Sequence, residues 1–244
     1  MIKLYLVSIG ALGPLAQAML CLLPPGRREK TMRYIKEEDR LRSAAAGLLL
    51  RYAFGTAFEE GLTRGDYGKP EAQGKQAPCP QGATGHRRHG GPHPPQGAGH
   101  LDPLRGDDIY FNLSHAGEYV VLATASSEVG VDIEPIAPFE REVAKRCFQK
   151  NEQAFLWEGE DSERRFAVLW TTKESIMKAT GRGFSLPPES FSILDSEGQM
   201  GCEVEGQKWY PQTFTWDRHI VTVTTRQKET LVPPTPLTKE ELTK

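Results

Sequence analysis

Two carboxylates stand at alternate positions in a short segment that could hold a divalent metal ion. In Gly130–Glu134 the apolar Val131 and Ile133 alternate with Asp132 and Glu134. In a strand, this alternation places both carboxylates on one face and both apolar side chains on the other. Two carboxylates a few ångströms apart oppose each other's ionisation unless a cation lies between them. Taken alone, the segment fits an Mg²⁺ site and the polar side of an exposed edge strand equally well.

A second segment adds a third carboxylate and a cation. Residues 170–178 read Trp-Thr-Thr-Lys-Glu-Ser-Ile-Met-Lys and lie inside a helix predicted over 162–180. Glu174 and Lys178 are one helical turn apart and share a face of the helix. The simplest interpretation of this spacing is an ion pair on the protein surface. Mg²⁺ in proteins uses few carboxylates and takes substrate phosphates as further ligands. Together the two segments indicate metal-dependent phosphate chemistry, with the lysine as a cation for the phosphate oxygens.

Six other side chains could contribute to an anion pocket, although each also has a simpler structural interpretation. Arg27, Arg28 and Lys30 precede the first long predicted helix, and Arg42 lies in its early turns. Taken alone, these basic residues are more typical of a solvated charged surface. Ser114 and His115 place a hydroxyl and an imidazole at the end of a predicted strand, where a loop can reach a ligand.

The overall composition excludes several classes of protein. The chain has 244 residues, of which 38% are hydrophobic and 25% charged, in the ordinary range for one large or two small globular domains. Its formal net charge of −2 gives no broad field to collect nucleic acid or a membrane, so anion binding must be local. The four cysteines are too far apart for short zinc or redox motifs, and reduced thiols in the cytoplasm are the simplest interpretation.

The uncharged stretch over 4–23 has two interpretations. It could be an export signal, because Ala16-Gln17-Ala18 resembles a signal-peptidase site. The glycines and proline near its middle favour instead a buried strand over Ile2–Ile9 and a short apolar helix over Leu15–Leu23, and they suit a membrane-spanning helix poorly. We expect the folded strand and helix of a cytoplasmic protein.

The pattern of apolar residues predicts an α+β fold. Helices are predicted over 37–60, 140–158 and 162–180. Strands are predicted over 109–113, 119–124, 130–134, 190–194, 201–205, 213–216 and 219–225. Because hairpins are mixed with helices, an α+β arrangement is favoured over a doubly wound parallel sheet.

Two segments are predicted to lie outside the folded core. An insertion over about 71–101 is rich in glycine, proline and histidine, and it has too few apolar side chains to offset the entropy of ordering. Its histidines could suggest a metal site, but a solvated loop of biased composition explains them better. Residues 231–244, with three prolines followed by charges, are predicted to be a flexible tail. The remainder suffices for two lobes, 1–127 and 128–230.

Four motifs carry more information in combination than singly. They are Tyr67–Pro70, Phe111–His115, Gly130–Glu134 and Trp170–Ser175, in that order. The combination resembles the 4'-phosphopantetheinyl transferase superfamily in its longer, monomeric, surfactin-synthetase-activating form. The resemblance runs from the N-terminal strand to about Thr225, and the last two motifs are the specific ones. It implies two similar α+β lobes related by a pseudo-twofold axis, with coenzyme A in the cleft between them.

The resemblance also implies roles for individual residues. Asp132, Glu134 and Glu174 correspond to Mg²⁺ ligands, and Lys178 to the lysine beside the coenzyme A pyrophosphate. Glu152 corresponds to a glutamate proposed in the family as the general base. The implied coenzyme A contacts are Arg27, Lys30, Arg42, Ser114 and His115, with Lys69 and Pro70 on the adenine side.

The implied reaction moves the phosphopantetheine arm of coenzyme A, the co-substrate, onto a serine of an apo acyl or peptidyl carrier protein. It releases adenosine 3',5'-bisphosphate and needs Mg²⁺, with no nucleic acid or membrane as partner. Two lobes in one chain complete the cleft, so we expect a monomer. The alternative is a non-catalytic module of the same fold that binds carrier proteins or a nucleotide, and the intact set of three carboxylates argues against it.

Overall fold

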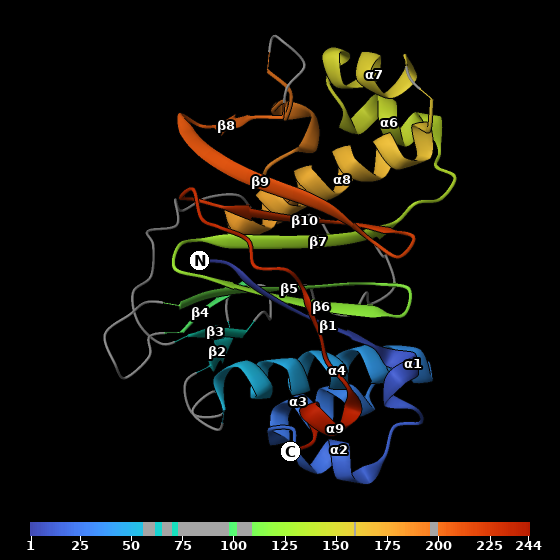
Figure 1. Ribbon diagram of the computed structural model, residues 1–244, viewed down its shortest axis with the longest axis vertical. Helices are drawn as coiled ribbons and strands as arrows, with labels where there is room; N and C mark the ends of the chain where they lie inside the picture. Colours follow the sequence, from blue (N-terminus) through green and yellow to red (C-terminus); the bar gives the residue numbers. More distant parts are fainter. Residues whose placement is uncertain (56–61, 65–69, 73–97, 102–108, 159, 196–199) are drawn as a thin grey trace.

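The protein is built from two stacked β-sheets, each covered on its outer face by helices (Figure 1). The computed structural model describes residues 1–55, 62–64, 70–72, 98–101, 109–158, 160–195 and 200–244. The helices are α1 (Ile9–Leu12), α2 (Gln17–Cys21), α3 (Pro25–Met32), α4 (Glu37–Phe54), α6 (Arg141–Cys147), α7 (Lys150–Trp157), α8 (Ser162–Ala179) and α9 (Lys239–Leu242). The strands are β1 (Lys3–Ser8), β2 (Leu62–Arg64), β3 (Pro70–Ala72), β4 (Ala98–Leu101), β5 (Ile109–Ala116), β6 (Tyr119–Ala125), β7 (Val129–Pro135), β8 (Cys202–Val204), β9 (Gln207–Trp216), β10 (His219–Thr225) and β11 (Thr235–Pro236).

The two main sheets are formed largely by successive parts of the chain. The first has the strand order β11-β1-β6-β5-β4 and the second β7-β10-β9-β8, while β2 and β3 form a small hairpin. Within the described residues, neighbouring strands of these sheets are antiparallel except for β1 and β11. The chain crosses from the first sheet to the second between β6 and β7. This mixture of antiparallel sheets and helices confirms the predicted α+β class.

Three apolar clusters fill the spaces between the layers. One lies between α4 and the first sheet, one between the two sheets, and one between the second sheet and α8. The middle cluster contains Val131 and Ile133 of β7, which are fully buried against side chains of β1 and β6. Asp132 therefore faces the other side of β7, toward α8, as the alternation in the sequence predicts.

Helix α8 approaches the second sheet very closely. Hydroxyl pairs join the two layers, with Thr171 Oγ1 2.8 Å from Thr222 Oγ1 and Ser175 Oγ 2.6 Å from Thr224 Oγ1. At Gly130 the backbone of β7 meets the backbone of α8, and a Cβ atom there would lie 1.9 Å from the Ser175 carbonyl oxygen. Glycine at 130 is therefore required by the contact between the helix and the strand that carry the candidate site.

We expect Gly130→Ala to lower the free energy of unfolding by about 3 kcal/mol or more, because the added methyl must displace backbone rather than a flexible side chain. Urea denaturation measures this change. Gly201→Ala is the matched control, because a Cβ at Gly201 meets no atom within 4 Å. Equal stabilities of the two variants would contradict the close approach of α8 to β7.

The prediction of a flexible tail over 231–244 is wrong. Strand β11 pairs with β1, and α9 packs beside α4 (Figure 1). Thr238 and Glu241 form a capping box at the start of α9. Leu237 before the cap and Leu242 in the first turn are both buried in the cluster under the first sheet, which is the arrangement of a hydrophobic staple. These apolar contacts hold the segment despite its prolines.

The described ends of the predicted insertion are also ordered into secondary structure. Residues 70–72 form β3, and residues 98–101 form β4 at the edge of the first sheet. The prediction of disorder over about 71–101 is wrong at these ends, where backbone pairing in the sheet provides the order. Residues 73–97, with most of the segment's histidines, lie outside the described residues.

Several predicted elements differ at their boundaries. The helix expected over 37–60 ends at Phe54, because Gly55 adopts φ +66° and terminates it. The helix expected over 140–158 is two helices, since Phe148 is extended and a capping box between Gln149 and Glu152 starts α7. The strand expected over 190–194 contributes only an isolated bridge at Leu194, following a short 3-10 turn at Pro188–Ser190.

The N-terminal segment folds as a strand and short helices. Strand β1 lies within the first sheet between β6 and β11, and α2 covers part of the stretch predicted to be helical. Within the described part of the chain, no helix has the length and apolar character needed to cross a membrane.

Candidate active site

The candidate site lies where α8 crosses the end of β7. Asp132 and Glu134 point from β7 toward α8, and Glu174 and Lys178 project from one face of the helix, four residues apart. Lys178 Nζ lies 2.5 Å from Asp132 Oδ1 and 3.7 Å from Glu174 Oε2. The structure therefore brings together all four residues that the two motifs of the sequence indicate.

Ser114 joins this group from the first sheet. Its Oγ donates a hydrogen bond to Asp132 Oδ1 over 2.9 Å and accepts one from Lys178 Nζ over 3.2 Å. The strand predicted over 109–113 ends before Ser114, but β5 continues to Ala116, so Ser114 is fully buried within the strand. The site is thus built from three elements, β5, β7 and α8, that span both sheets.

The three carboxylates oppose each other's ionisation in this buried setting. Burial, together with the charges of Asp132 and Glu174, raises the pKa of Glu134 to about 8. Burial raises the pKa of Glu174 to about 7, even though Lys178 lowers it. The raised pKa values of the two glutamates indicate that the group lacks positive charge, because it contains one lysine and three carboxylic acids.

The oxygen donors and the negative charge of this group suit a divalent cation. Asp132 Oδ2 is buried and has no hydrogen-bond partner among the described residues. Three ionised carboxylates and one lysine carry a charge of about −2, which a single divalent ion would offset. As they stand, no three acidic, imidazole or thiol side chains of the described residues are gathered closely enough to hold a metal. Lys178 is the cation that bridges Asp132 and Glu174 in this structure.

Comparison with known proteins identifies the family. The model of the 4'-phosphopantetheinyl transferase superfamily matches residues 128–224, the segment that carries Asp132, Glu174 and Lys178. The 4'-phosphopantetheinyl transferase Sfp of Bacillus subtilis is 31% identical over 191 residues, covering 77% of this chain and 74% of the relative. The chain belongs to the 4'-phosphopantetheinyl transferase superfamily. This finding confirms the resemblance inferred from the four motifs.

Two further relatives carry the same family name. The 4'-phosphopantetheinyl transferase ffp of Bacillus subtilis is 31% identical over 181 residues, covering 73% of this chain and 69% of the relative. The 4'-phosphopantetheinyl transferase gsp of Aneurinibacillus migulanus is 39% identical over 94 residues, covering 38% of this chain and 40% of the relative.

The predicted anion-binding residues of this transferase lie on the helices beneath the first sheet and on β5. Arg27 and Lys30 belong to α3, and burial lowers the pKa of Arg27, whose side-chain carbons lie against Gly47 of α4. Arg42 is held by Asp39 at 2.7 Å and by the Gly117 carbonyl oxygen at 2.8 Å. Arg42 thus reaches the turn that follows β5, near the predicted phosphate contacts.

The other predicted coenzyme A contacts are only partly placed. His115 follows Ser114 in β5, so its side chain leaves the opposite face of the strand from the carboxylate site. Pro70 begins β3, and Lys69 lies outside the described residues. The structure therefore gathers Ser114 with the carboxylates.

Glu152 lies in a second buried cluster. Its Oε2 is 2.9 Å from Lys173 Nζ and accepts a hydrogen bond from the Gln149 amide, and its Oε1 accepts one from the Ile193 amide. Both oxygens are occupied, and both members of the pair are fully buried. The hydrogen bonds of Glu152 therefore cap the start of α7 and hold the segment 187–194 in place. This structural role differs from the proton transfer that the resemblance implies.

Two important side chains were not singled out in the sequence. Lys173 donates to the carbonyl oxygens of Pro188 and Phe191 in addition to its pair with Glu152. Trp170 lies close to Glu134 and lowers the pKa of that carboxyl, against the larger effect of burial, which raises it. Their positions in the motif next to Glu174 were visible, but their partners lie in distant segments.

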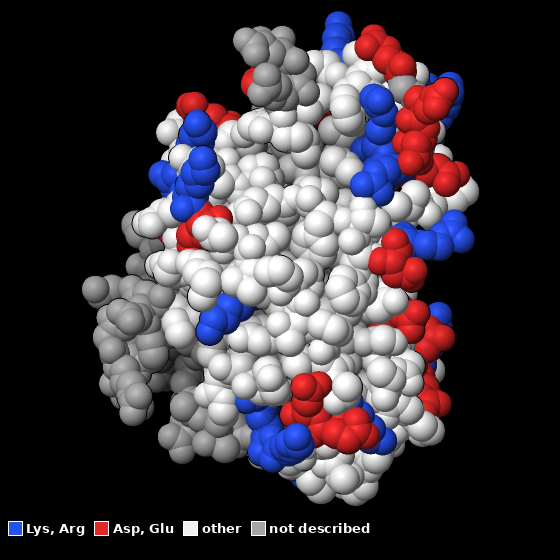
Figure 2. Space-filling model, viewed as in Figure 1, with Lys and Arg blue, Asp and Glu red and all other residues white. Residues whose placement is uncertain are grey.

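The surface around these layers carries charges of both signs. Figure 2 shows basic and acidic side chains interspersed on one face of the molecule, with no broad patch of one sign.

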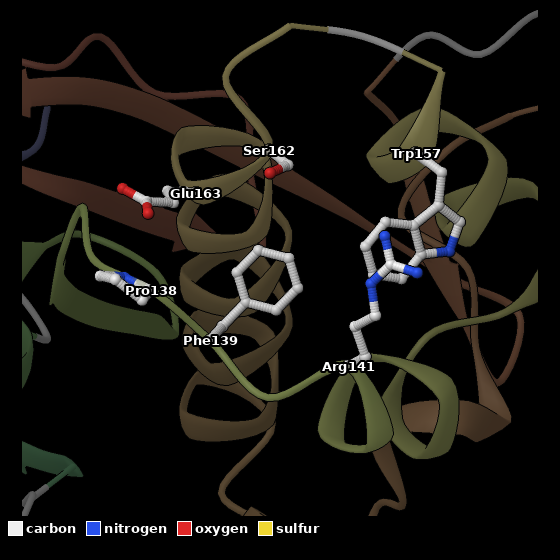
Figure 3. A pocket seen from close by; sticks show the side chains of 6 residues that line it. All are labelled: Pro138, Phe139, Arg141, Trp157, Ser162 and Glu163. Atoms are coloured by element: carbon white, nitrogen blue, oxygen red, sulfur yellow. The ribbon is translucent and has the colours of Figure 1, made fainter.

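On the flank of α8 there is a pocket lined by Pro138, Phe139, Arg141, Trp157, Ser162 and Glu163 (Figure 3). Arg141 lies over the Trp157 ring, 4.7 Å from its centre.

The raised pKa values predict a pH-dependent stability of the metal-free transferase. With folded-state pKa values of about 8 for Glu134 and about 7 for Glu174, above the ordinary 4.5, the folded state binds more protons than the unfolded state in this range. Stability therefore falls as the pH rises, and we expect a lower Tm at about pH 8.5 than at about pH 7 in EDTA.

Calorimetry with the Glu134→Gln variant checks this assignment. The variant should show a smaller decrease in Tm over the same pH range, because it lacks one of the two titrating carboxyls. A wild-type Tm that stays constant or rises between these pH values would contradict the crowding of the carboxylates.

Proposed function

We propose that this transferase moves the phosphopantetheine arm of coenzyme A onto a serine hydroxyl of an apo acyl or peptidyl carrier protein and releases adenosine 3',5'-bisphosphate. The observation that carries the proposal is the buried group of Asp132, Glu174 and Lys178 in a chain of this family. We propose that the protein acts in the cytoplasm as a monomer.

In this proposal Asp132, Glu134 and Glu174 hold Mg²⁺, and their excess negative charge supports the assignment. The metal, when bound, would stabilise the charge that develops on the pyrophosphate as the phosphoryl bond breaks. Catalysis of phosphoryl transfer is mainly positioning and charge stabilisation, which fits a rigid group built on two strands and a helix.

Lys178 is the positively charged side chain that the protein itself contributes to the site. It is almost fully buried and held by Asp132, Ser114 and the Val131 carbonyl oxygen. A cation fixed in this way is oriented before the substrate arrives, so it loses little conformational freedom when it meets a phosphate oxygen. Ser114, which lies on the first sheet, forms hydrogen bonds with both Asp132 and Lys178 and so fixes their relative positions.

We further propose that coenzyme A lies between the lobes 1–127 and 128–230. Arg27, Lys30, Arg42 and His115 would bind its phosphates, with Lys69 and Pro70 at the adenine. The contact of Arg42 with the turn after β5 supports a phosphate site at that end of the strand. Glu152 is assigned to holding Lys173, because both of its oxygens already accept hydrogen bonds.

Intact-mass spectrometry tests the proposal. An apo carrier protein incubated with the transferase, coenzyme A and Mg²⁺ should gain the mass of one phosphopantetheine group, and EDTA should abolish the gain. No gain with fatty-acid, polyketide and nonribosomal-peptide carriers, with the transferase shown to be folded, would contradict the proposal and favour a non-catalytic binding module.

A further inference from the structure

Buried hydroxyl groups join helix α8 to the second sheet. The helix lies against β7 and β10 of that sheet (Figure 1). Thr171 Oγ1 of the helix is 2.8 Å from Thr222 Oγ1 of β10, and Ser175 Oγ is 2.6 Å from Thr224 Oγ1. All four side chains are fully buried. These two contacts, hereafter the hydroxyl pairs, lie in a layer where a helix and a sheet usually bury apolar side chains.

The direction of the hydrogen bonds follows from the single proton of each hydroxyl. Thr171 donates to a carbonyl oxygen of its own helix over 2.8 Å, so the proton between Thr171 and Thr222 comes from Thr222. Ser175 likewise donates to a carbonyl oxygen of α8 over 2.8 Å, so Thr224 donates to Ser175. In both pairs the sheet therefore donates to the helix. Loss of the helix hydroxyl would leave a buried donor on the sheet without its acceptor.

The hydroxyl pairs lie directly beside the carboxylates of the candidate site. On the helix, Thr171 is three residues before Glu174, and Ser175 directly follows it. On the sheet, Thr222 is the antiparallel partner of Asp132, so both side chains leave the same face of the sheet. The contacts that hold the helix to the sheet are thus within one turn, or one strand, of the carboxylates.

The distance between Glu174 and Asp132 depends on how α8 lies along the sheet, because the two residues belong to different elements. Apolar packing is non-directional and tolerates small shifts of a helix. Buried hydrogen bonds have preferred lengths and angles, and a fully satisfied network specifies one arrangement. Gly130 permits the close approach of α8 to β7, and the hydroxyl pairs fix the position of the helix along the sheet.

We propose that Thr171 and Ser175 are positioning residues, which place Glu174 relative to Asp132 by fixing the register of α8 on β10. This inference rests on the proposed function, because it takes the two carboxylates as metal ligands. Neither hydroxyl touches the reacting atoms. A displacement of about 1 Å can cost about 100-fold in the rate of an enzyme, so even a small shift of the helix is measurable.

The first test measures metal affinity. Binding of Mn²⁺, followed by electron paramagnetic resonance in the presence of coenzyme A, is compared for the wild type, Thr171→Val and Thr171→Ser. Thr171→Val keeps the branched shape and loses the hydroxyl, so its Mn²⁺ affinity should fall by about tenfold. Thr171→Ser keeps the hydroxyl and should bind Mn²⁺ as the wild type does. Equal affinities of Thr171→Val and the wild type, or equal losses in the two variants, would overturn the inference.

Thr172→Val is the matched control. Thr172 is also fully buried on α8, and its hydroxyl donates to the Val168 carbonyl oxygen over 2.7 Å, just as Thr171 donates to the Ala167 carbonyl oxygen. Both valine variants therefore lose the same kind of bond within the helix, and Thr171→Val also loses the bond to the sheet. An equal fall in Mn²⁺ affinity in both variants would show a general effect on α8 and would overturn the inference.

A double variant separates positioning from stability. Thr171→Val combined with Thr222→Val removes both hydroxyls of one pair, which leaves neither without its partner. Thr213 Oγ1, 2.9 Å from Thr222 Oγ1, belongs to an exposed residue and can bind water instead. The midpoint of urea denaturation should lie closer to that of the wild type than in Thr171→Val alone, while the Mn²⁺ affinity stays low. Recovery of the affinity together with the midpoint would show that the pair serves stability alone and would overturn the inference.

The second hydroxyl pair is tested by Ser175→Ala, which should also lower the Mn²⁺ affinity. An unchanged affinity in this variant would overturn the role of Ser175. Failure of the wild type to bind Mn²⁺ at all would overturn the proposed metal site as well. Normal binding by the wild type with an unaffected Thr171→Val would overturn this inference alone.

Discussion

Replacing Asp132 by asparagine lowers the rate of phosphopantetheine transfer by about 10²- to 10³-fold, in the proposed mechanism. Asparagine keeps the size of the side chain and can still accept from Ser114 and Lys178, but it removes one of the charges that hold the metal. It also leaves Lys178 without its nearest counter-charge, so the phosphate-binding cation loses its fixed position. The rate constant kcat, measured from the mass of the carrier protein over time, should fall more than KM rises.

A matched variant makes this result specific. Glu203→Gln removes a carboxylate from the exposed side of β8 and should leave the rate unchanged. Melting temperatures of both variants establish that they are folded. Transfer by a folded Asp132→Asn protein at close to the wild-type rate would exclude Asp132 from the metal site.

The buried pair of Glu152 and Lys173 predicts the largest effect on stability. We expect Glu152→Gln to lower the free energy of unfolding by about 3–5 kcal/mol, because it leaves the fully buried Lys173 ammonium without a counter-charge. The same change weakens the bonds to the Gln149 and Ile193 amides, which start α7 and hold the segment before β8. Urea denaturation at neutral pH measures the loss.

The exposed pair of Glu142 and Lys145 on α6 serves as the comparison, since breaking a surface ion pair costs about 1 kcal/mol or less. Glu142→Gln should therefore leave the free energy of unfolding almost unchanged.

The transfer activity decides whether Glu152 serves to hold Lys173 or to take the serine proton. A folded Glu152→Gln protein of normal stability whose transfer rate falls a hundredfold would show that Glu152 takes the serine proton, as the family resemblance implies.

Local patterns were sufficient to predict much of the site. The alternation in Gly130–Glu134 requires only that the segment be a strand, and the spacing of Glu174 and Lys178 requires only a helix. Both requirements are met by β7 and α8, so the sequence predicts which of these side chains share a face. The absence of a side chain at Gly130 permits the close approach of the two elements, and this role of the glycine can be recognised only when the opposing helix is known.

Contacts between distant segments could not be predicted in this way. The pairing of Glu152 with Lys173 depends on how α7 packs on α8, and no spacing in the sequence encodes it. Burial of Ser114 depends likewise on the stacking of two sheets. The C-terminal segment is different, because the capping box from Thr238 to Glu241 was readable beside the prolines that suggested flexibility.

Strand β11 and helix α9 bear on how the chain can fold during its synthesis. Strand β11 completes the first sheet beside β1, and the segment with α9 adds two buried leucines, Leu237 and Leu242, to the core under that sheet. The first sheet and its core therefore stay incomplete until residues 231–244 have left the ribosome. The second sheet, over 129–225, needs no such late contribution to its strand pairing. The half of the protein that is translated first is therefore completed last, and truncation near Leu231 should impair the N-terminal core rather than the carboxylate-bearing sheet.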